Sequence, residues 1–442
     1  MRLKPIFPLV FIVLTFFFPL FYAFGQDSQE LSLDEAINLS LEHNLPLRKT
    51  EIELTSSAYS EKNLWSALFP TISASASAGY RKNLLSDITL PNEGPNYSLG
   101  LGIRLGLNAG IPYAMNIIKL AHQDKLLEYE DAKNQLSIQI TKMFYSLVAD
   151  NENLLLLEEI FNLAQRQLTR SEVSFRNGIV GELTLTQSRL AAEDARYNLS
   201  AAKTTYESSM AEFLAMLGMS IEEKNITLLD EVNVIKIEAD SEALINQYLP
   251  KRPDIVKKTQ DIKRLEAVSS RDSLSARAPS LDLSINWGSS TFDPFSDSIS
   301  ATAQVNIPID PWIPGTKQAQ SIKNTLNDIK KAKLDLEMTE KSAKTQIRSL
   351  SVLLKNSWNS ILIARLSLEA AQRSHQLTEQ GFNNGTVELL TLQDARNNMA
   401  GAQQRLLRTE LLYFDRILDL SSALNINWNT LIQTYGVPSE EI

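Results

Sequence analysis

The residues that could carry out chemistry in this chain are few and widely separated. The 442-residue sequence has no cysteine and only three histidines, His43, His122 and His375. Each histidine lies on a separate helical stretch, without a second ligand at the spacing that a zinc site or a Ser-His-Asp triad requires. The absence of cysteine excludes disulfides and thiol catalysis. The sequence therefore argues against an enzyme and predicts no metal or other cofactor.

Nucleotide and nucleic-acid chemistry are disfavoured as well. No phosphate-binding Gly-rich loop is present, so any energy that the function requires must come from a partner protein. The methionines are scattered and are expected to fill gaps in packing rather than to bind copper. The formal net charge is −9 at pH 7, which argues against nucleic acid as a partner.

The chain is organised around a stretch that occurs twice. Residues 175–189 read FRNGIVGELTLTQSR and residues 382–396 read FNNGTVELLTLQDAR, at an offset of 207 positions. In both copies a long helical pattern ends at Asn-Gly, where glycine suits the left-handed conformation that stops a helix, and a second long helical pattern follows. The sequence therefore predicts two structural repeats, residues 26–230 and 231–442.

Residues 1–25 predict a signal peptide. Arg2 and Lys4 precede an apolar run from Ile6 to Phe24, and small residues lead to a predicted cleavage site before Gln26. The alternative is an uncleaved membrane anchor, because the run approaches the ~20 residues that span a bilayer. We expect an exported chain that is not lipid-anchored through an N-terminal cysteine.

Two β-hairpins are predicted, at about residues 71–108 and 281–308, because the periodicity there changes to two. One face of each strand is apolar, and Gly, Ser, Arg and Asn line the other. Strands of ~9–11 residues cross a bilayer when they are tilted in a barrel. We expect Tyr80, Tyr97 and Trp287 to form an aromatic girdle at the membrane surface. The alternative is a soluble antiparallel sheet whose apolar face covers a core.

The number of strands predicts an oligomer. Four strands cannot close a barrel, since ~8 is the practical minimum, and open strand edges are not tolerated in lipid. Other copies of the chain must therefore complete the sheet, which gives 8 strands in a dimer or 12 in a trimer.

Very long helices follow each hairpin. One runs for ~60 residues, or ~90 Å, from Pro112 to Asn177, and another runs from Thr316 to Asn383. Return helices are predicted at residues 182–217 and 388–424. Shorter helices precede each hairpin, one of them from about Pro46 to Phe69. Part of the second long helix keeps a 3.5-residue repeat, which makes helices wind around one another. A polar, irregular stretch at about residues 218–240 and a short polar C-terminal tail complete the chain.

This arrangement resembles the TolC-like outer-membrane efflux proteins, the outer membrane factors. The twin turns carry the resemblance, which covers nearly the whole chain after residue 25. It implies a mainly α fold with a small transmembrane β part. Three subunits would form an α-barrel tunnel of long antiparallel helices, topped by a 12-strand β-barrel in the lipid of the outer membrane, with 4 strands per subunit.

The resemblance also implies a function. The protein would be a passive exit duct of a tripartite efflux or type I secretion system, located in the outer membrane and extending into the periplasm. Its partners would be a periplasmic membrane-fusion adaptor and an inner-membrane transporter of the RND, ABC or a similar class. The alternative is a periplasmic coiled-coil scaffold without a pore.

Matched position by position, the resemblance assigns two sets of residues at the twin turns. Asp394 matches an aspartate of the pore constriction, whereas Thr391 stands where an acidic residue often lies, and Thr184 and Gln187 are their uncharged equivalents in the first repeat. The alternative for Asp394 is an aspartate at a helix N-terminus, stabilised by the helix dipole. The adaptor-docking tip would comprise Phe175, Gly178, Val180, Leu183, Phe382, Gly385, Val387 and Leu390.

Overall fold

The structure is a computed structural model that describes residues 29–81, 94–219, 226–229, 234–292 and 295–437. The predicted signal peptide, residues 1–25, lies outside the described residues, as do the last residues of the predicted tail. The part of the chain predicted as the first repeat contains β1 (Gln29–Leu31), α1 (Leu33–His43), α2 (Leu45–Lys62), η1 (Leu64–Leu68), β2 (Thr71–Arg81), β3 (Gly94–Leu107), α3 (Ile111–Arg176), α4 (Glu182–Leu217) and β4 (Ile226–Leu228). The part predicted as the second repeat contains β5 (Lys236–Ile237), α5 (Ser241–Tyr248), η2 (Leu249–Lys251), α6 (Pro253–Arg277), β6 (Ser280–Phe292), β7 (Phe295–Asn306), η3 (Asp310–Trp312), α7 (Lys317–Asn383), α8 (Leu389–Leu424), α9 (Trp428–Tyr435) and β8 (Gly436–Val437).

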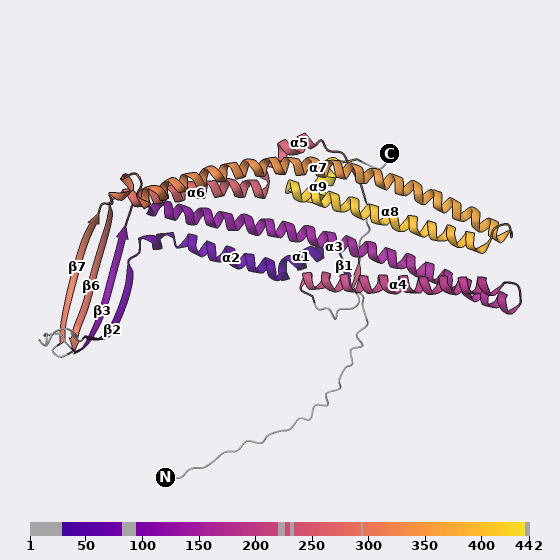
Figure 1. Cartoon of the computed structure of the whole chain (residues 1–442), viewed down its shortest axis with the longest axis horizontal. Helices are drawn as coiled ribbons and strands as arrows, with labels where there is room; N and C mark the ends of the chain where they lie inside the picture. Colours follow the sequence, from indigo (N-terminus) through magenta and orange to yellow (C-terminus); the bar gives the residue numbers. More distant parts are fainter. Residues whose placement is uncertain (1–28, 82–93, 220–225, 230–233, 293–294, 438–442) are drawn as a thin grey trace, which may run out of the picture.

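The long helices form a single layer (Figure 1). Helix α3 packs against α2 and α4 on one side and against α6 and α8 on the other, and α7 packs against α6 and α8. The layer therefore has two edges. One edge consists of α2 followed by α4, and the other is α7.

Helices α3 and α7 run the full length of this layer. They contain 66 and 67 residues, which corresponds to about 100 Å each at ~1.5 Å per residue. Pro112 lies in the first turn of α3, and the Thr316 side chain caps α7 by accepting a hydrogen bond from the backbone N–H of Ala319. Within the described ranges, every helix is too short or too polar to cross a membrane.

A four-stranded antiparallel sheet in the order β2-β3-β6-β7 extends from one end of the layer (Figure 1). Its register joins like with like. Ile72 lies opposite Ile103, which lies opposite Ile285, whereas Ser73 lies opposite Gly102. The apolar and polar faces predicted from the alternation are therefore continuous across the sheet. Strand β6 extends to Phe292 and β7 begins at Phe295, within the hairpin predicted at about residues 281–308.

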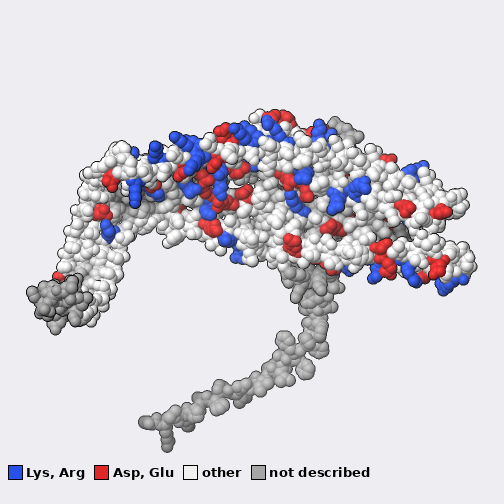
Figure 2. Space-filling view, viewed as in Figure 1, with Lys and Arg blue, Asp and Glu red and all other residues white. Residues whose placement is uncertain are grey.

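Charged side chains gather over the helices, and few lie on the visible face of the sheet (Figure 2). On the polar face Arg104 pairs with Asp282, at 3.5 Å. The apolar face is exposed in the subunit, where Ile72 is 76% exposed and Ile299 is 75% exposed. An exposed apolar face that extends over four strands indicates that it contacts either an apolar environment or a partner protein.

The core lies midway along the layer, where α3, α4, α7 and α8 meet the short elements. Phe144, Phe213 and Tyr413 are fully buried there. The Tyr413 hydroxyl donates to the carbonyl of Ile235 at 3.0 Å and accepts from the N–H of Ile237 at 2.9 Å. This side chain therefore fixes β5 on α8, and burial raises its pKa to about 12.

Three predictions about the shorter elements were wrong. The stretch 218–240 was expected to be irregular, but it contains β4, which pairs with β1, and β5, which pairs with β8. The polar tail contains α9, which buries Leu431 completely. Helix α2 ends at Lys62 rather than at Phe69, because the chain then changes to the 3-10 helix η1, in which the N–H groups of Ser66 and Phe69 donate to carbonyls three residues earlier.

Candidate functional site

The twin turns at the end of the layer opposite the sheet are built by the same hydrogen bonds. The N–H of Gly178 donates to the carbonyl of Phe175 at 2.9 Å, and the next N–H donates to Ser174 at 2.8 Å. In the second repeat, Gly385 donates to Phe382 at 3.0 Å and the next N–H donates to Gly381 at 2.9 Å. This pair of bonds is the Schellman motif, which satisfies the last carbonyls of a helix.

The two glycines have φ values of +70° at Gly178 and +73° at Gly385. A Cβ atom at either position would meet no atom within 4 Å. Glycine is therefore required for the left-handed backbone and not for space, as the sequence predicted.

The residues assigned to the docking tip form an apolar rim around these turns. The Phe175, Leu183 and Leu390 side chains are 40%, 71% and 52% exposed. Val180, Phe382 and Val387 are half-buried beside them. Ile179 follows Gly178 and is 73% exposed, so it belongs to the same rim although the assignment omitted it. An exposed apolar rim of this kind is suited to contact with another protein.

The four residues assigned to the constriction lie in the first two turns of α4 and α8, directly after the rim residues Leu183 and Leu390. Thr184 and Gln187 are on α4, and Thr391 and Asp394 are at the matching positions of α8. Gln187, Thr391 and Asp394 are exposed, and Thr184 is half-buried. Helix α3 packs between α4 and α8, so one subunit places the two pairs on separate helices rather than in one cluster.

A cavity that the sequence did not reveal lies where α3, α4 and α8 meet near the tip. Its volume is about 370 Å³, and its lining includes Leu163, Asp194, Arg396 and Asn397. Arg396 donates from Nε to Nε2 of His375 at 3.3 Å, which links α8 to α7. The only sequence signal noted for the Arg396 contact was that arginine recurs at the matching positions 189 and 396.

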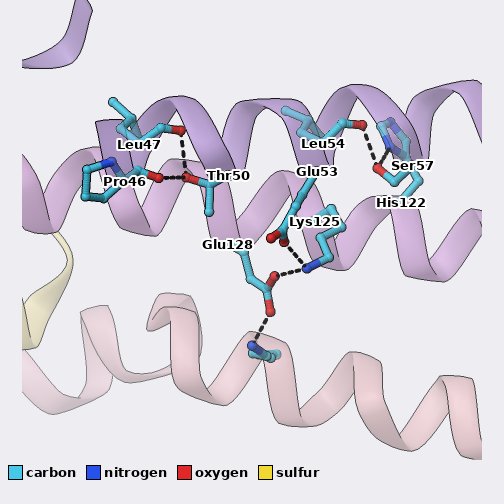
Figure 3. Close-up of polar contacts among 10 residues, drawn as sticks. Pro46, Leu47, Thr50, Glu53, Leu54, Ser57, His122, Lys125 and Glu128 are labelled. Atoms are coloured by element: carbon cyan, nitrogen blue, oxygen red, sulfur yellow. Dashed lines mark hydrogen bonds and ion pairs between the residues drawn. The ribbon is translucent and has the colours of Figure 1, made fainter. Parts of the chain in front are cut away.

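In the half of the layer nearest the sheet, ion pairs connect neighbouring helices (Figure 3). Lys125 of α3 contacts Glu53 of α2 at 2.9 Å and Glu128 at 2.8 Å, and Glu128 also accepts from Lys257 of α6 at 2.6 Å. Hydrogen bonds from Lys125 lower the pKa of both carboxyl groups, with Lys257 adding to the effect on Glu128.

The histidines take part in similar local contacts. His122 Nδ1 lies 2.9 Å from Ser57 Oγ (Figure 3), and His122 Nε2 lies 3.5 Å from a Glu61 oxygen. In the described part of the chain, no group of three or more His, Asp and Glu side chains could hold a metal ion.

The structure joins a sheet with one apolar face to a layer of helices ~100 Å long. This combination is typical of one class of protein, the subunits of channels that have a β part in the membrane and a long helical tunnel. Comparison with known proteins agrees with this class. The sequence profile of the family described as "Outer membrane efflux protein" matches residues 36–219 and 244–425. The chain belongs to this family.

One relative is the probable efflux pump outer membrane protein TtgC of Pseudomonas putida. It is 25% identical over 429 residues, and the match covers 90% of this chain and 83% of that protein. Among solved structures, the CmeC outer membrane channel of Campylobacter jejuni has a TM-score of 0.73 at 19% identity, covering 91% of this chain and 88% of CmeC. The open-state MtrE outer membrane channel of Neisseria gonorrhoeae has a TM-score of 0.68 at 18% identity, covering 89% of each chain.

These findings establish the fold and the general role. The protein is mainly α, with long helices and a small β part, and it serves as an exit duct for efflux in the outer membrane. The family and the structural neighbours are channels rather than enzymes. The alternative of a periplasmic scaffold without a pore is not supported.

Proposed function

We propose that three copies of this chain close edge to edge into one duct, with their sheets forming a barrel and their helices a tunnel. The observation that carries the proposal is the open layer. Strands β2 and β7 are the unpaired outer strands of the sheet, and α2 with α4 and α7 are the outer helices of the layer. Because neighbouring strands alternate in direction, β7 of one copy and β2 of the next are antiparallel and suited to pairing.

The apolar residues at these helical edges support the same assembly. On α2, Leu45, Ile52 and Tyr59 are seven residues apart and 75%, 70% and 71% exposed. A seven-residue apolar repeat indicates packing against another helix. Two copies would give a barrel of ~8 strands, whose interior side chains fill, whereas three copies leave room for a passage. The four-strand sheet of each subunit would supply one third of that barrel.

The tip is the proposed site of contact with other pump components. The apolar rim at the twin turns would dock a periplasmic membrane-fusion adaptor, which connects the duct to an energised inner-membrane transporter. Three copies of Asp394 would then lie around the narrow end, where repulsion between like charges is appreciable. At the other end, Tyr80, Tyr97 and Trp287 share the apolar face of the sheet and would contact lipid at the membrane surface.

Native mass spectrometry of protein extracted from the outer-membrane fraction tests the assembly. Three chains per particle are expected, because only then does the strand set close around a lumen. A monomer would leave four strands with open edges in lipid and would refute the proposal. A dimer would refute the wide duct while retaining edge-to-edge closure.

A further inference from the structure

Helix α4 exposes an apolar stripe at the edge of the layer. Leu183, Leu190 and Tyr197 follow one another at intervals of seven residues and are 71%, 62% and 73% exposed. The opposite side of α4 packs on α3, since buried Ser188 hydrogen-bonds Ser171 of α3 at 2.8 Å. Leu190 is two residues from Ser188, or about 200° around the helix, so the stripe faces away from α3.

Helix α7 exposes a matching stripe at the other edge. Ile363 and Leu377 are 68% and 54% exposed, and Ala370 between them is exposed as well. Ile361 is fully buried two residues from Ile363, so this stripe also points out of the layer. Both stripes keep the seven-residue spacing of a coiled-coil seam.

We propose that these two stripes meet as an antiparallel seam between neighbouring subunits, in a defined register. Leu183 lies opposite Leu377 of the partner subunit, Leu190 opposite the partner's Ala370, and Tyr197 opposite the partner's Ile363. The inference rests on the proposed assembly of three copies and specifies how their tip halves join.

The internal repeat supports this register independently. By the repeat, α4 corresponds to α8 and α7 corresponds to α3, so the seam between subunits should match the contact of α8 with α3 inside one subunit. In that contact Asn397 and Leu163 line the same cavity. Subtracting the repeat offset of 207 from Asn397 gives Leu190, and adding it to Leu163 gives Ala370. These two residues are also opposite one another in the register proposed from the stripes.

A second contact inside the subunit gives nearly the same register. Gln404 of α8 donates to Asn153 of α3 at 2.9 Å. The repeat offset converts this pair into Tyr197 and Ser360, and Ser360 is within one helical turn of Ile363. One pair that lines a common cavity and one hydrogen-bonded pair inside the subunit therefore support this register to within one helical turn.

The two kinds of seam differ in chemistry at equivalent positions. Inside the subunit, Asn397 and Gln404 occupy the places of Leu190 and Tyr197, and the seam encloses a cavity of about 370 Å³. In the proposed seam between subunits, Leu190 and Tyr197 make the α4 side apolar, and they face the partner's Ala370 and the partner's Ser360.

Cross-linking tests the register, because the chain has no native cysteine. Paired variants Leu183→Cys with Leu377→Cys, and Leu190→Cys with Ala370→Cys, are oxidised in outer-membrane fractions and run on denaturing gels. Covalent two-chain and three-chain products are expected. Leu163→Cys with Asn397→Cys is the matched control, and its cross-link must stay within one chain.

A shifted pair, Leu183→Cys with Ile363→Cys, places the thiols about 21 Å apart along the helices and should not cross-link, since 14 residues rise ~1.5 Å each. Trimers that form the shifted product instead of the in-register products would overturn the register and leave the three-copy duct intact. Monomers in native mass spectrometry would overturn both. A cross-link between chains in the control pair would show that the polar contact, and not the apolar one, joins subunits.

Discussion

Replacing Gly385 with alanine isolates the contribution of backbone conformation to the tip. The left-handed φ of +73° is unfavourable for an L-residue with a Cβ by roughly 1–2 kcal/mol. No atom lies within 4 Å of the added methyl group, so steric overlap contributes nothing. Gly385→Ala should therefore weaken the turn by that amount, which corresponds to a factor of about 5–30 in its local opening.

Gly401→Ala is the matched control, because it adds the same methyl group to the same helix. Gly401 lies inside α8, and a Cβ there also meets no atom within 4 Å. Its backbone is helical, so alanine should stabilise α8 by about 0.5–1 kcal/mol. Gly385→Asn should fall between wild type and Gly385→Ala, since Asn425 already adopts φ 54° at the end of α8.

Hydrogen exchange read by mass spectrometry measures the effect directly. The amides of Asn384, Gly385 and Thr386 donate to carbonyls of the preceding turn at 2.9–3.0 Å. Gly385→Ala should accelerate their exchange about 5–30-fold, and Gly401→Ala should leave them unchanged while slowing exchange within α8. Equal exchange at the turn in wild type and Gly385→Ala would refute the argument that φ alone demands glycine.

Three further changes are predicted. Tyr413→Phe should lower the free energy of unfolding by about 1–3 kcal/mol, because the buried N–H of Ile237 and the partly buried carbonyl of Ile235 lose their partner. The absorbance at 295 nm that this substitution removes should show a neutral phenol up to a pKa of about 12, and the contribution of Tyr413 to stability should be complete below ~10 and lost above that pKa. Lys125→Met should lower the thermal midpoint at neutral pH. The difference should shrink below about pH 4, where Glu53 and Glu128, whose pKa values are lowered in the fold, become protonated; an unchanged difference at acid pH would contradict the ion-pair explanation. Asp394→Ala should raise single-channel conductance and reduce cation selectivity in planar bilayers, whereas unchanged selectivity would leave Asp394 with only a role at the helix end.

The features that the sequence predicted are those with a local physical cause. The twin turns were predictable because Asn-Gly ends a helix through the backbone of one residue, Gly178 or Gly385. The strands were predictable because alternation along 71–81 or 280–292 reports a two-faced environment residue by residue.

The features that were missed depend on partners distant in the sequence. Strand β5 has two residues and no recognisable pattern, and it forms because Tyr413 and β8 supply its hydrogen bonds. The cavity near Arg396 depends on which helices are neighbours, and periodicity does not determine that. The constriction residues remain a proposal for the same reason, since Asp394 acquires its surroundings only when other copies are present.

The two short ladders have a consequence for the order of folding. Strand β1 pairs with β4, joining Gln29 to Ile226, and β5 pairs with β8, joining Ile237 to Gly436. Each ladder closes a loop of about 200 residues, so its contacts are far less local than those of the helical hairpins and are expected to form late. A chain that stops short of Ile226 has no partner for β1, and one that stops short of Gly436 leaves β5 unpaired. Each ladder thus forms only when its half of the chain is complete, and an incomplete chain leaves the otherwise buried Leu31 or Ile237 exposed, which favours aggregation or degradation over assembly.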